Sequence, residues 1–137
     1  MQPCELCEQT GGTLVWQNAF CRVVLVEDAD YAGFCRVICN EHVTEMTDLA
    51  IPQRSQMMMT VCKVEQAIRD VMQPDKINLA SLGNVTPHLH WHVIPRYYGD
   101  KHFPQPIWGT VQRLAELSPP DDWRSRLFAH IQSSLTV

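Results

Sequence analysis

Long apolar runs and clusters of basic residues are both absent from this chain. No uninterrupted stretch reaches about 18 apolar residues, the length at which a helix becomes able to span a bilayer, so we expect no membrane partner. The first residues, Met-Gln-Pro-Cys-Glu, lack the basic start and apolar run of a signal peptide, which predicts a cytoplasmic protein. Lysine and arginine number 11 against 15 acidic residues, for a net charge of −4. Proteins that bind nucleic acids need many cations to neutralise phosphates, so we expect no nucleic-acid partner.

Internal repeats, low-complexity tracts and linkers are also missing. A chain of 137 residues with 45% hydrophobic residues has the size and composition of a single soluble domain. We divide it into an N-terminal loop over 1–12, a core over 13–96, and a C-terminal loop with helices over 97–137. The expected fold class is α+β.

Hydrophobic periodicity predicts the elements of this domain. Alternating or β-branched stretches predict five strands, at 13–16, 20–27, 34–39, 76–82 and 88–94, which pair as a mostly antiparallel sheet. Apolar residues at three- and four-residue steps predict one long helix between Pro52 and Pro74. Two short helices are expected near the C-terminus, over about 110–117 and 121–134.

Three of the six histidines occur at alternate positions, His88, His90 and His92, with apolar residues between them. Because side chains alternate across a strand, we expect all three rings on one face. A neutral imidazole held through one nitrogen presents the other as a nucleophile near pH 7. We therefore assign His90 as a nucleophile toward phosphorus, with His92 contacting a phosphate oxygen or protonating the leaving group. The alternatives are three solvent-facing histidines on an edge strand, or a catalytic metal ion held by the row.

Cys4 and Cys7 form a Cys-x-x-Cys pair, which is half of a tetrahedral zinc site. In a cytoplasmic protein the six cysteines are expected to be reduced thiols or metal ligands. Histidines are the natural completion, and His42 and His88 are the two candidates. Two alternatives compete with this interpretation. One is a redox pair, although such a pair normally follows a strand, and the other is two free surface cysteines.

Four further residues are candidate substrate contacts. Asn84 and Thr86 immediately precede the histidine strand and can donate hydrogen bonds to phosphate oxygens. Asp28 follows a predicted strand and can accept hydrogen bonds from a ribose diol, or it can cap its own turn. Trp108 lies in a loop rich in proline and glycine, where its indole can pack on the site, on a second subunit or on the loop itself.

Several of these segments together resemble the histidine triad (HIT) superfamily. The run His88-Leu-His-Trp-His-Val-Ile94 is similar to its His-φ-His-φ-His-φ-φ motif, where φ is hydrophobic. Residues 33–43 are similar to the Gly-His-x-Leu-Val-x-Pro-x-x-His-Val stretch that precedes the long helix. Leu82-Gly83-Asn84 and Ile94-Pro95-Arg96 also fit, and the Cys4–Cys7 pair resembles that of zinc-containing bacterial members. The resemblance covers residues 1–109.

This resemblance implies a HIT-like fold, usually a homodimer, that binds nucleotides and attacks an α-phosphate. It implies that His90 becomes nucleotidylated, that His92 and Asn84 contact phosphate, and that His88 either orients the site or binds zinc. In members with the cysteine pair, the ligands correspond to Cys4, Cys7, His88 and the His42 position. The chain departs from the family pattern in its shortened turn at 83–87, at Phe34 in place of a histidine, and at the acidic pair 27–28.

The leading hypothesis is therefore a hydrolase, or a nucleotidyltransferase, with a covalent nucleotidyl–His90 intermediate. Its substrates are expected to be dinucleoside polyphosphates or nucleotide conjugates. Hydrolysis is favoured because so short a chain shows no second substrate-binding module. We expect the Zn²⁺ to be structural and to fix the N-terminal loop to the sheet. The alternative is a module of the same fold that binds nucleotide and zinc without turnover.

Overall fold

Five antiparallel strands form one sheet in the order β1-β2-β3-β5-β4 in the computed structural model, which describes residues 3–136. The strands are β1 (Thr13–Gln17), β2 (Cys21–Leu25), β3 (Cys35–Cys39), β4 (Lys76–Ala80) and β5 (His90–Arg96). All five predicted strands are confirmed, and the first three form the expected meander. β5 lies between β3 and β4, so that His92 is paired with Arg36 on one side and Ala80 on the other.

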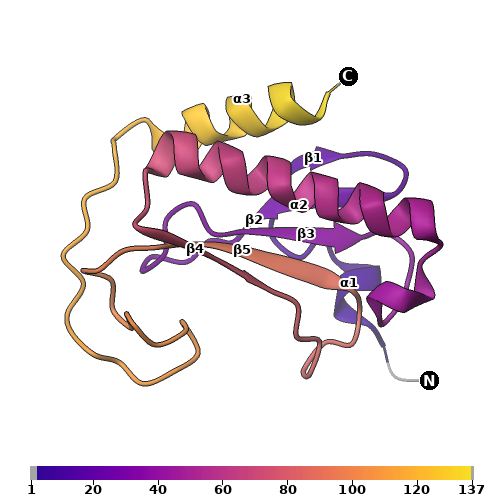
Figure 1. Cartoon of the computed structure of the whole chain (residues 1–137), viewed down its shortest axis with the longest axis horizontal. Helices are drawn as coiled ribbons and strands as arrows, with labels where there is room; N and C mark the ends of the chain where they lie inside the picture. Colours follow the sequence, from indigo (N-terminus) through magenta and orange to yellow (C-terminus); the bar gives the residue numbers. More distant parts are fainter. Residues whose placement is uncertain (1–2, 137) are drawn as a thin grey trace.

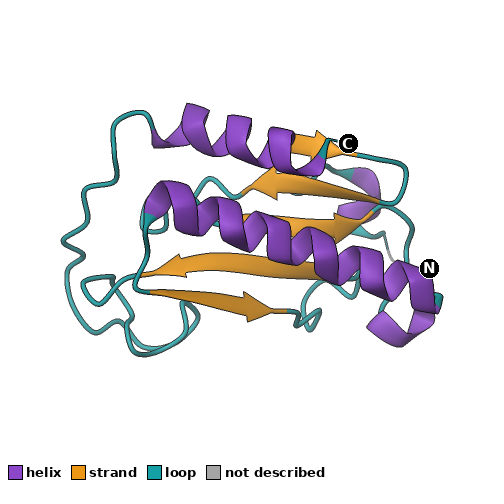
Figure 2. Ribbon diagram, turned by 45° about the horizontal axis from the view of Figure 1, so that its top comes forward, coloured by secondary structure: helices purple, strands orange, loops and turns teal. Residues whose placement is uncertain are grey.

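Two long helices cover one face of this sheet (Figures 1 and 2). They are α2 (Ile51–Met72) and α3 (Trp123–Leu135), and the shorter elements are α1 (Glu5–Glu8) and η1 (Met46–Asp48). The predicted bounds of α2 are confirmed: Pro52 lies in its first turn, and the chain leaves it through Gln73 in the left-handed conformation, followed by Pro74. None of the helices within residues 3–136 combines the length and apolarity needed to cross a membrane.

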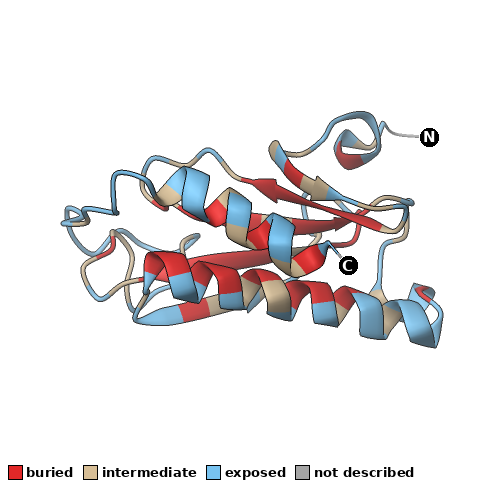
Figure 3. Ribbon diagram, turned by 90° about the horizontal axis from the view of Figure 1, so that it is seen from above, coloured by how far each residue is buried: buried red, intermediate tan, exposed pale blue. Residues whose placement is uncertain are grey.

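The hydrophobic core fills the space between the sheet and these helices. Figure 3 shows the buried stripes of α2 and α3 turned toward the strands. The fully buried residues of the core come from both the sheet and the helices, and they include Val23, Val37, Val64, Ile68, Val93, Leu127 and Ile131. Because side chains alternate along β5, Val93 points into this core while His90 and His92 point to the opposite face. The fold therefore presents the histidines on the sheet face that α2 and α3 leave free.

Two expectations about the termini are corrected. The predicted N-terminal loop contains the one-turn helix α1, whose Leu6 packs on Val24 and Ile38; residues 1 and 2 of that loop lie outside the described residues. The helix expected over 110–117 does not form. Its backbone N–H groups at Gln112 and Glu116 instead donate to carbonyls of the preceding loop, and Leu114 stays 91% exposed. The apolar residues Val111 and Leu114 stay exposed, and burial supplies most of the stability of a short helix. The second C-terminal helix is confirmed as α3.

Candidate active site and metal centre

His90 is the first residue of β5, and its ring is fixed by the backbone that precedes it. The Nδ1–H group of His90 donates a 2.5 Å hydrogen bond to the carbonyl oxygen of His88. This bond assigns the proton to Nδ1 and leaves the lone pair on Nε2. Burial lowers the pKa of His90, and the positive charge of Arg36 lowers it further against the opposing effect of the backbone bond. The ring is therefore neutral at pH 7, with an unprotonated nitrogen available for attack.

His92 shares the strand face with His90, and their rings meet edge to face with centroids 4.9 Å apart. Burial is the main cause that lowers the pKa of His92 to about 4, and electrostatic repulsion from a protonated His90 and from Arg36 adds to it. Its Nδ1 is buried and has no hydrogen-bond partner among residues 3–136. A neutral ring with an unsatisfied nitrogen is suited to contact one phosphate oxygen or to pass a proton.

Aromatic rings enclose His92. The Trp108 ring lies edge to face at 5.1 Å and the Phe34 ring at 5.6 Å, centroid to centroid. The Trp108 indole stays 52% exposed, so one part of it packs on the histidine while another part faces solvent. The structure therefore brings Trp108 to the site, as one of the sequence-based interpretations expected. It also places Phe34, which stands where the family pattern has a histidine, directly against His92.

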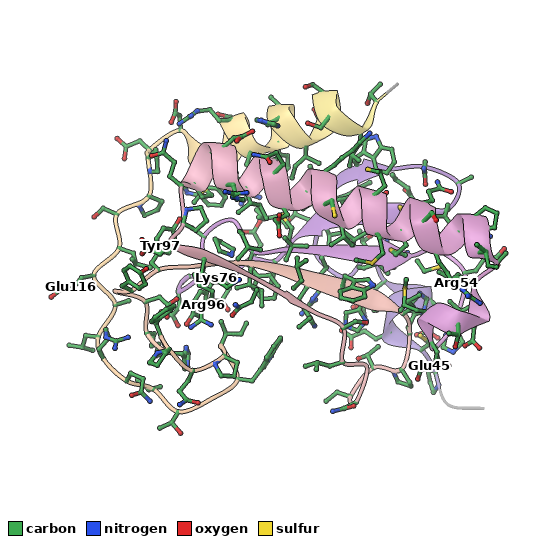
Figure 4. The ribbon with its side chains drawn as sticks, viewed as in Figure 1. Glu45, Arg54, Lys76, Arg96, Tyr97 and Glu116 are labelled. Atoms are coloured by element: carbon green, nitrogen blue, oxygen red, sulfur yellow. The ribbon has the colours of Figure 1, made fainter. Side chains whose placement is uncertain are left out.

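A buried ion pair holds the loop that carries Trp108. Arg96, at the end of β5, donates from Nε and Nη2 to the Asp100 carboxylate at 2.8 and 3.1 Å, and both side chains are almost fully buried. Asp100 also accepts from the backbone N–H groups of three neighbours: Tyr97, His102 and Phe103. Arg96 and Tyr97 lie together where this loop leaves the sheet, at the opposite end from Glu45 and Arg54 (Figure 4). Sequence reasoning missed this pair, although the four-residue spacing of Arg96 and Asp100 was visible.

Three predicted substrate contacts lie apart from this cluster or are engaged locally. Asp28 accepts a hydrogen bond from the N–H of Asp30 at 2.9 Å, so one of its carboxylate oxygens caps its own turn. Asn84 is exposed in the turn before β5. Thr86 lines a cavity of about 310 Å³ beside Cys4 and His42, on the side of the predicted metal ligands. Substrate contact by these three residues stays a prediction.

The four predicted metal ligands do come together. Their ligand atoms, on Cys4, Cys7, His42 and His88, all lie within 4.8 Å of one another. The single turn of α1 brings the two cysteines to one side, and His88 lies just before β5 rather than within the expected row of three. The strand face therefore carries only His90 and His92 of the row. This arrangement also leaves no set of three histidines for a catalytic ion, because His88 is turned toward the cysteines.

The geometry of this cluster fits a tetrahedral zinc ion. The Nδ1 of His88 lies 3.3 Å from Cys4 Sγ and 3.5 Å from Cys7 Sγ, and the Nδ1 of His42 lies 3.3 Å from Cys7 Sγ. Ordinary Zn–S and Zn–N bond lengths in a tetrahedron separate sulfur and nitrogen by about 3.6 Å. The Nε2–H of His88 donates to the Cys39 carbonyl at 2.6 Å, which leaves the Nδ1 lone pair directed at the sulfurs. Such an outer hydrogen bond is typical of histidine ligands of zinc.

Comparison with known proteins agrees with this architecture. The HIT domain family matches residues 8–99. An AP-4-A phosphorylase from Mycobacterium tuberculosis (strain H37Rv) is 30% identical over 84 residues, which are 57% of this chain and 43% of the relative. This chain therefore matches less than half the length of that relative.

Solved structures extend the likeness to the whole chain. A histidine triad protein from Bradyrhizobium japonicum superposes with a TM-score of 0.77 at 26% identity, over 99% of this chain and 98% of the other. A Zn-bound histidine triad family protein from Mycobacterium smegmatis shares the fold, with a TM-score of 0.66 at 20% identity, over 95% of this chain and 94% of the other. The family match covers most of the sequence and the strand that carries the histidines, so this chain belongs to the HIT family.

Proposed function

We propose that this protein is a nucleotide hydrolase that works through a covalent nucleotidyl–His90 intermediate. The observation that carries the proposal is the hydrogen bond from His90 Nδ1 to the His88 carbonyl, which directs an unprotonated Nε2 away from the backbone. A dinucleoside polyphosphate is the leading substrate class, supported by the likeness to an AP-4-A phosphorylase. Nucleotide conjugates are the second class. A nucleotidyltransferase would share the same first step and would then pass the nucleotidyl group to an acceptor other than water.

The chemistry has two displacements at phosphorus. In the first, His90 Nε2 forms a bond to the α-phosphorus while the bond to the bridging oxygen breaks, and the leaving group departs with that electron pair. In the second, water forms a bond to the same phosphorus, the P–N bond breaks, and the water proton passes to solvent. His92 contacts a non-bridging oxygen or relays a proton, and Trp108 packs beside the reacting groups, which favours exclusion of water from His92.

The zinc site supports this chemistry from a distance. We propose that Cys4, Cys7, His42 and His88 hold a structural Zn²⁺, which fixes α1 against the sheet. The likeness to a Zn-bound HIT protein supports this assignment, along with the donor geometry. His88 serves both sites in this scheme, since its ring faces the cysteines while its carbonyl holds His90. Homodimer formation stays a prediction that follows from the family, and a cytoplasmic location stays a prediction that follows from the N-terminal sequence.

The test is the fate of the label in a single-turnover experiment. Enzyme mixed with α-³²P-labelled dinucleoside polyphosphate and quenched in alkali should carry label on His90, because a phosphoramidate survives base. His90→Ala should abolish turnover and labelling while nucleotide binding remains. His130→Ala is the matched control, since His130 lies on α3 on the opposite face of the sheet and pairs with Asp70. If His90→Ala keeps most of its activity, the mechanism is wrong. A melting shift with nucleotides and no product from any of them identifies the non-catalytic module instead.

A further inference from the structure

Arg36 places a positive charge on the face of the sheet that carries the histidines. In the register of β3 and β5, Arg36 is the Cα partner of His92, and Ile38 is the partner of His90. Directly paired residues of antiparallel strands point to the same side, with Cβ atoms about 5 Å apart. The Arg36 guanidinium carbon also lies 5.8 Å from the centroid of Phe34, the ring that packs against His92.

The hydrogen bonds of Arg36 are incomplete. Its Nη1 donates to the carbonyl of Gly11 at 3.0 Å, whereas its Nε is buried and has no hydrogen-bond partner in the described part of the chain. Among the carboxylates of residues 3–136, none forms a salt bridge with it. Burial lowers the pKa of Arg36 below its ordinary value, although the negative charge of Glu5 acts in the opposite direction. A partly buried cation without a counter-ion is costly unless an anion completes its coordination.

A second arginine on the same sheet face shows what a purely structural arginine looks like here. Arg22, on β2, is the Cα partner of Ile38 and is buried. All three of its guanidinium nitrogens donate to protein oxygens: the carbonyls of Leu6, Gln9 and Thr10 and the side chain of Asn40. Arg22 therefore fastens the N-terminal segment to the sheet, and each of its guanidinium nitrogens is engaged. Arg36 lies one strand nearer to the histidines and makes one such bond.

The sequence at this position also differs from the family pattern. Residues 33–43 are similar to a family stretch in which leucine stands at the position of Arg36. An exposed or half-buried leucine on that face would complete no hydrogen bonds and attract no anion. Arg36 therefore differs from that pattern, and it lies next to the two histidines that face the phosphate in the proposed function.

We propose that Arg36 is a catalytic residue that binds a phosphate oxygen of the nucleotide held at His90 and His92. This assignment rests on the proposed function and adds the group that neutralises the transferred phosphate. The guanidinium matches phosphate geometry, and it stabilises the charge that gathers on the non-bridging oxygens during displacement. It acts from a rigid central strand, so little reorganisation accompanies the reaction. The predicted substrate is accordingly an anionic phosphate ester, and the nucleoside part gains nothing from this residue.

The test compares ligands that differ only in phosphate. Calorimetry on the zinc-loaded full chain measures AMP and GMP against adenosine and guanosine, and pyrophosphate serves as the anion alone. Arg36→Met should weaken binding of the mononucleotides and of pyrophosphate by about 10- to 100-fold, the range for a hydrogen bond to a charged group. Binding of the nucleosides should stay within twofold, and Arg36→Lys should keep part of the affinity. Arg69→Met, which removes an exposed arginine from α2 on the opposite face, should change none of these values.

Two outcomes overturn the assignment. In the first, wild type and Arg36→Met bind pyrophosphate with the same affinity, or neither binds it. The other is an equal loss for AMP and adenosine, which marks a structural role. The single-turnover labelling of His90 tests the proposed function independently of this assignment. Intact labelling with no effect of Arg36 removes only the assignment of Arg36, whereas absent labelling with Arg36-dependent pyrophosphate binding removes only the nucleotidyl mechanism.

Discussion

Replacing Asp100 by asparagine should lower the free energy of unfolding more than any conservative substitution on the surface of this protein. The Asp100 carboxylate is fully buried and accepts hydrogen bonds from Arg96 and from three backbone N–H groups. Asparagine keeps one acceptor oxygen and turns an amide donor toward other donors. Arg96, only 2% exposed, then keeps its charge without a counter-ion. Breaking one partner of a buried pair costs about 3–5 kcal/mol, a large share of the stability of a domain of this size.

Acid should reproduce part of this loss in the wild type. Burial of Asp100 acts to raise its pKa, but Arg96 and the backbone donors outweigh it and lower the pKa to about 2 from 3.8. Because the folded state has the lower pKa, the stabilisation is fully present above the ordinary pKa of 3.8. It is lost as the pH falls from there through about 2, and amounts to about 2 kcal/mol at most.

Urea denaturation at several pH values measures both effects. At pH 7, Asp100→Asn should lower the free energy of unfolding by about 3–5 kcal/mol, and the gap to wild type should narrow as the pH falls from 5 toward 2.5. Asp30→Asn is the matched control in the same region, because its ion pair with Lys101 is exposed and should cost less than about 1 kcal/mol. A gap below 1 kcal/mol for Asp100→Asn, or one that is constant with pH, would refute the reasoning.

Two further predictions concern the metal and the loop. Purified protein should contain about one zinc per chain. Loss of the metal, by chelation or by Cys7→Ser, should lower the melting temperature below that of the zinc-loaded protein, whereas Cys62→Ser, at an exposed position of α2, should not change it. Equal melting temperatures with and without metal would contradict a structural zinc. Trp108→Ala should raise KM for the nucleotide roughly 5- to 10-fold through loss of packing beside the histidines, with Trp108→Phe close to wild type. Tyr98→Ala, in the same loop and 66% exposed, serves as its control, and an equal KM for Trp108→Ala and wild type would separate Trp108 from the site.

Hydrophobic patterns within single segments were enough to predict most of the strands and helices of this fold. Alternating or β-branched stretches located all five strands, and the apolar stripe between Pro52 and Pro74 located α2. The segment 110–117 failed because its apolar residues imitate a helical face, while no neighbour is present to cover them. Whether such a segment forms a helix depends on tertiary burial, which periodicity does not contain.

The site divides in the same way. Residue types and spacing indicated the nucleophile candidate and a metal site at Cys4 and Cys7, with His42 and His88 as candidates to complete it, because Cys-x-x-Cys and alternating histidines restrict the chemistry that can occur there. Only the tertiary structure decided that His88 leaves the strand and joins the cysteines, since that depends on where Cys39 offers its carbonyl. The same holds for the charge that Arg36 contributes beside His92, because it follows from the register of two strands that lie more than fifty residues apart in the sequence. Spacing along one segment is local information, whereas pairing between distant segments is settled only when the chain packs.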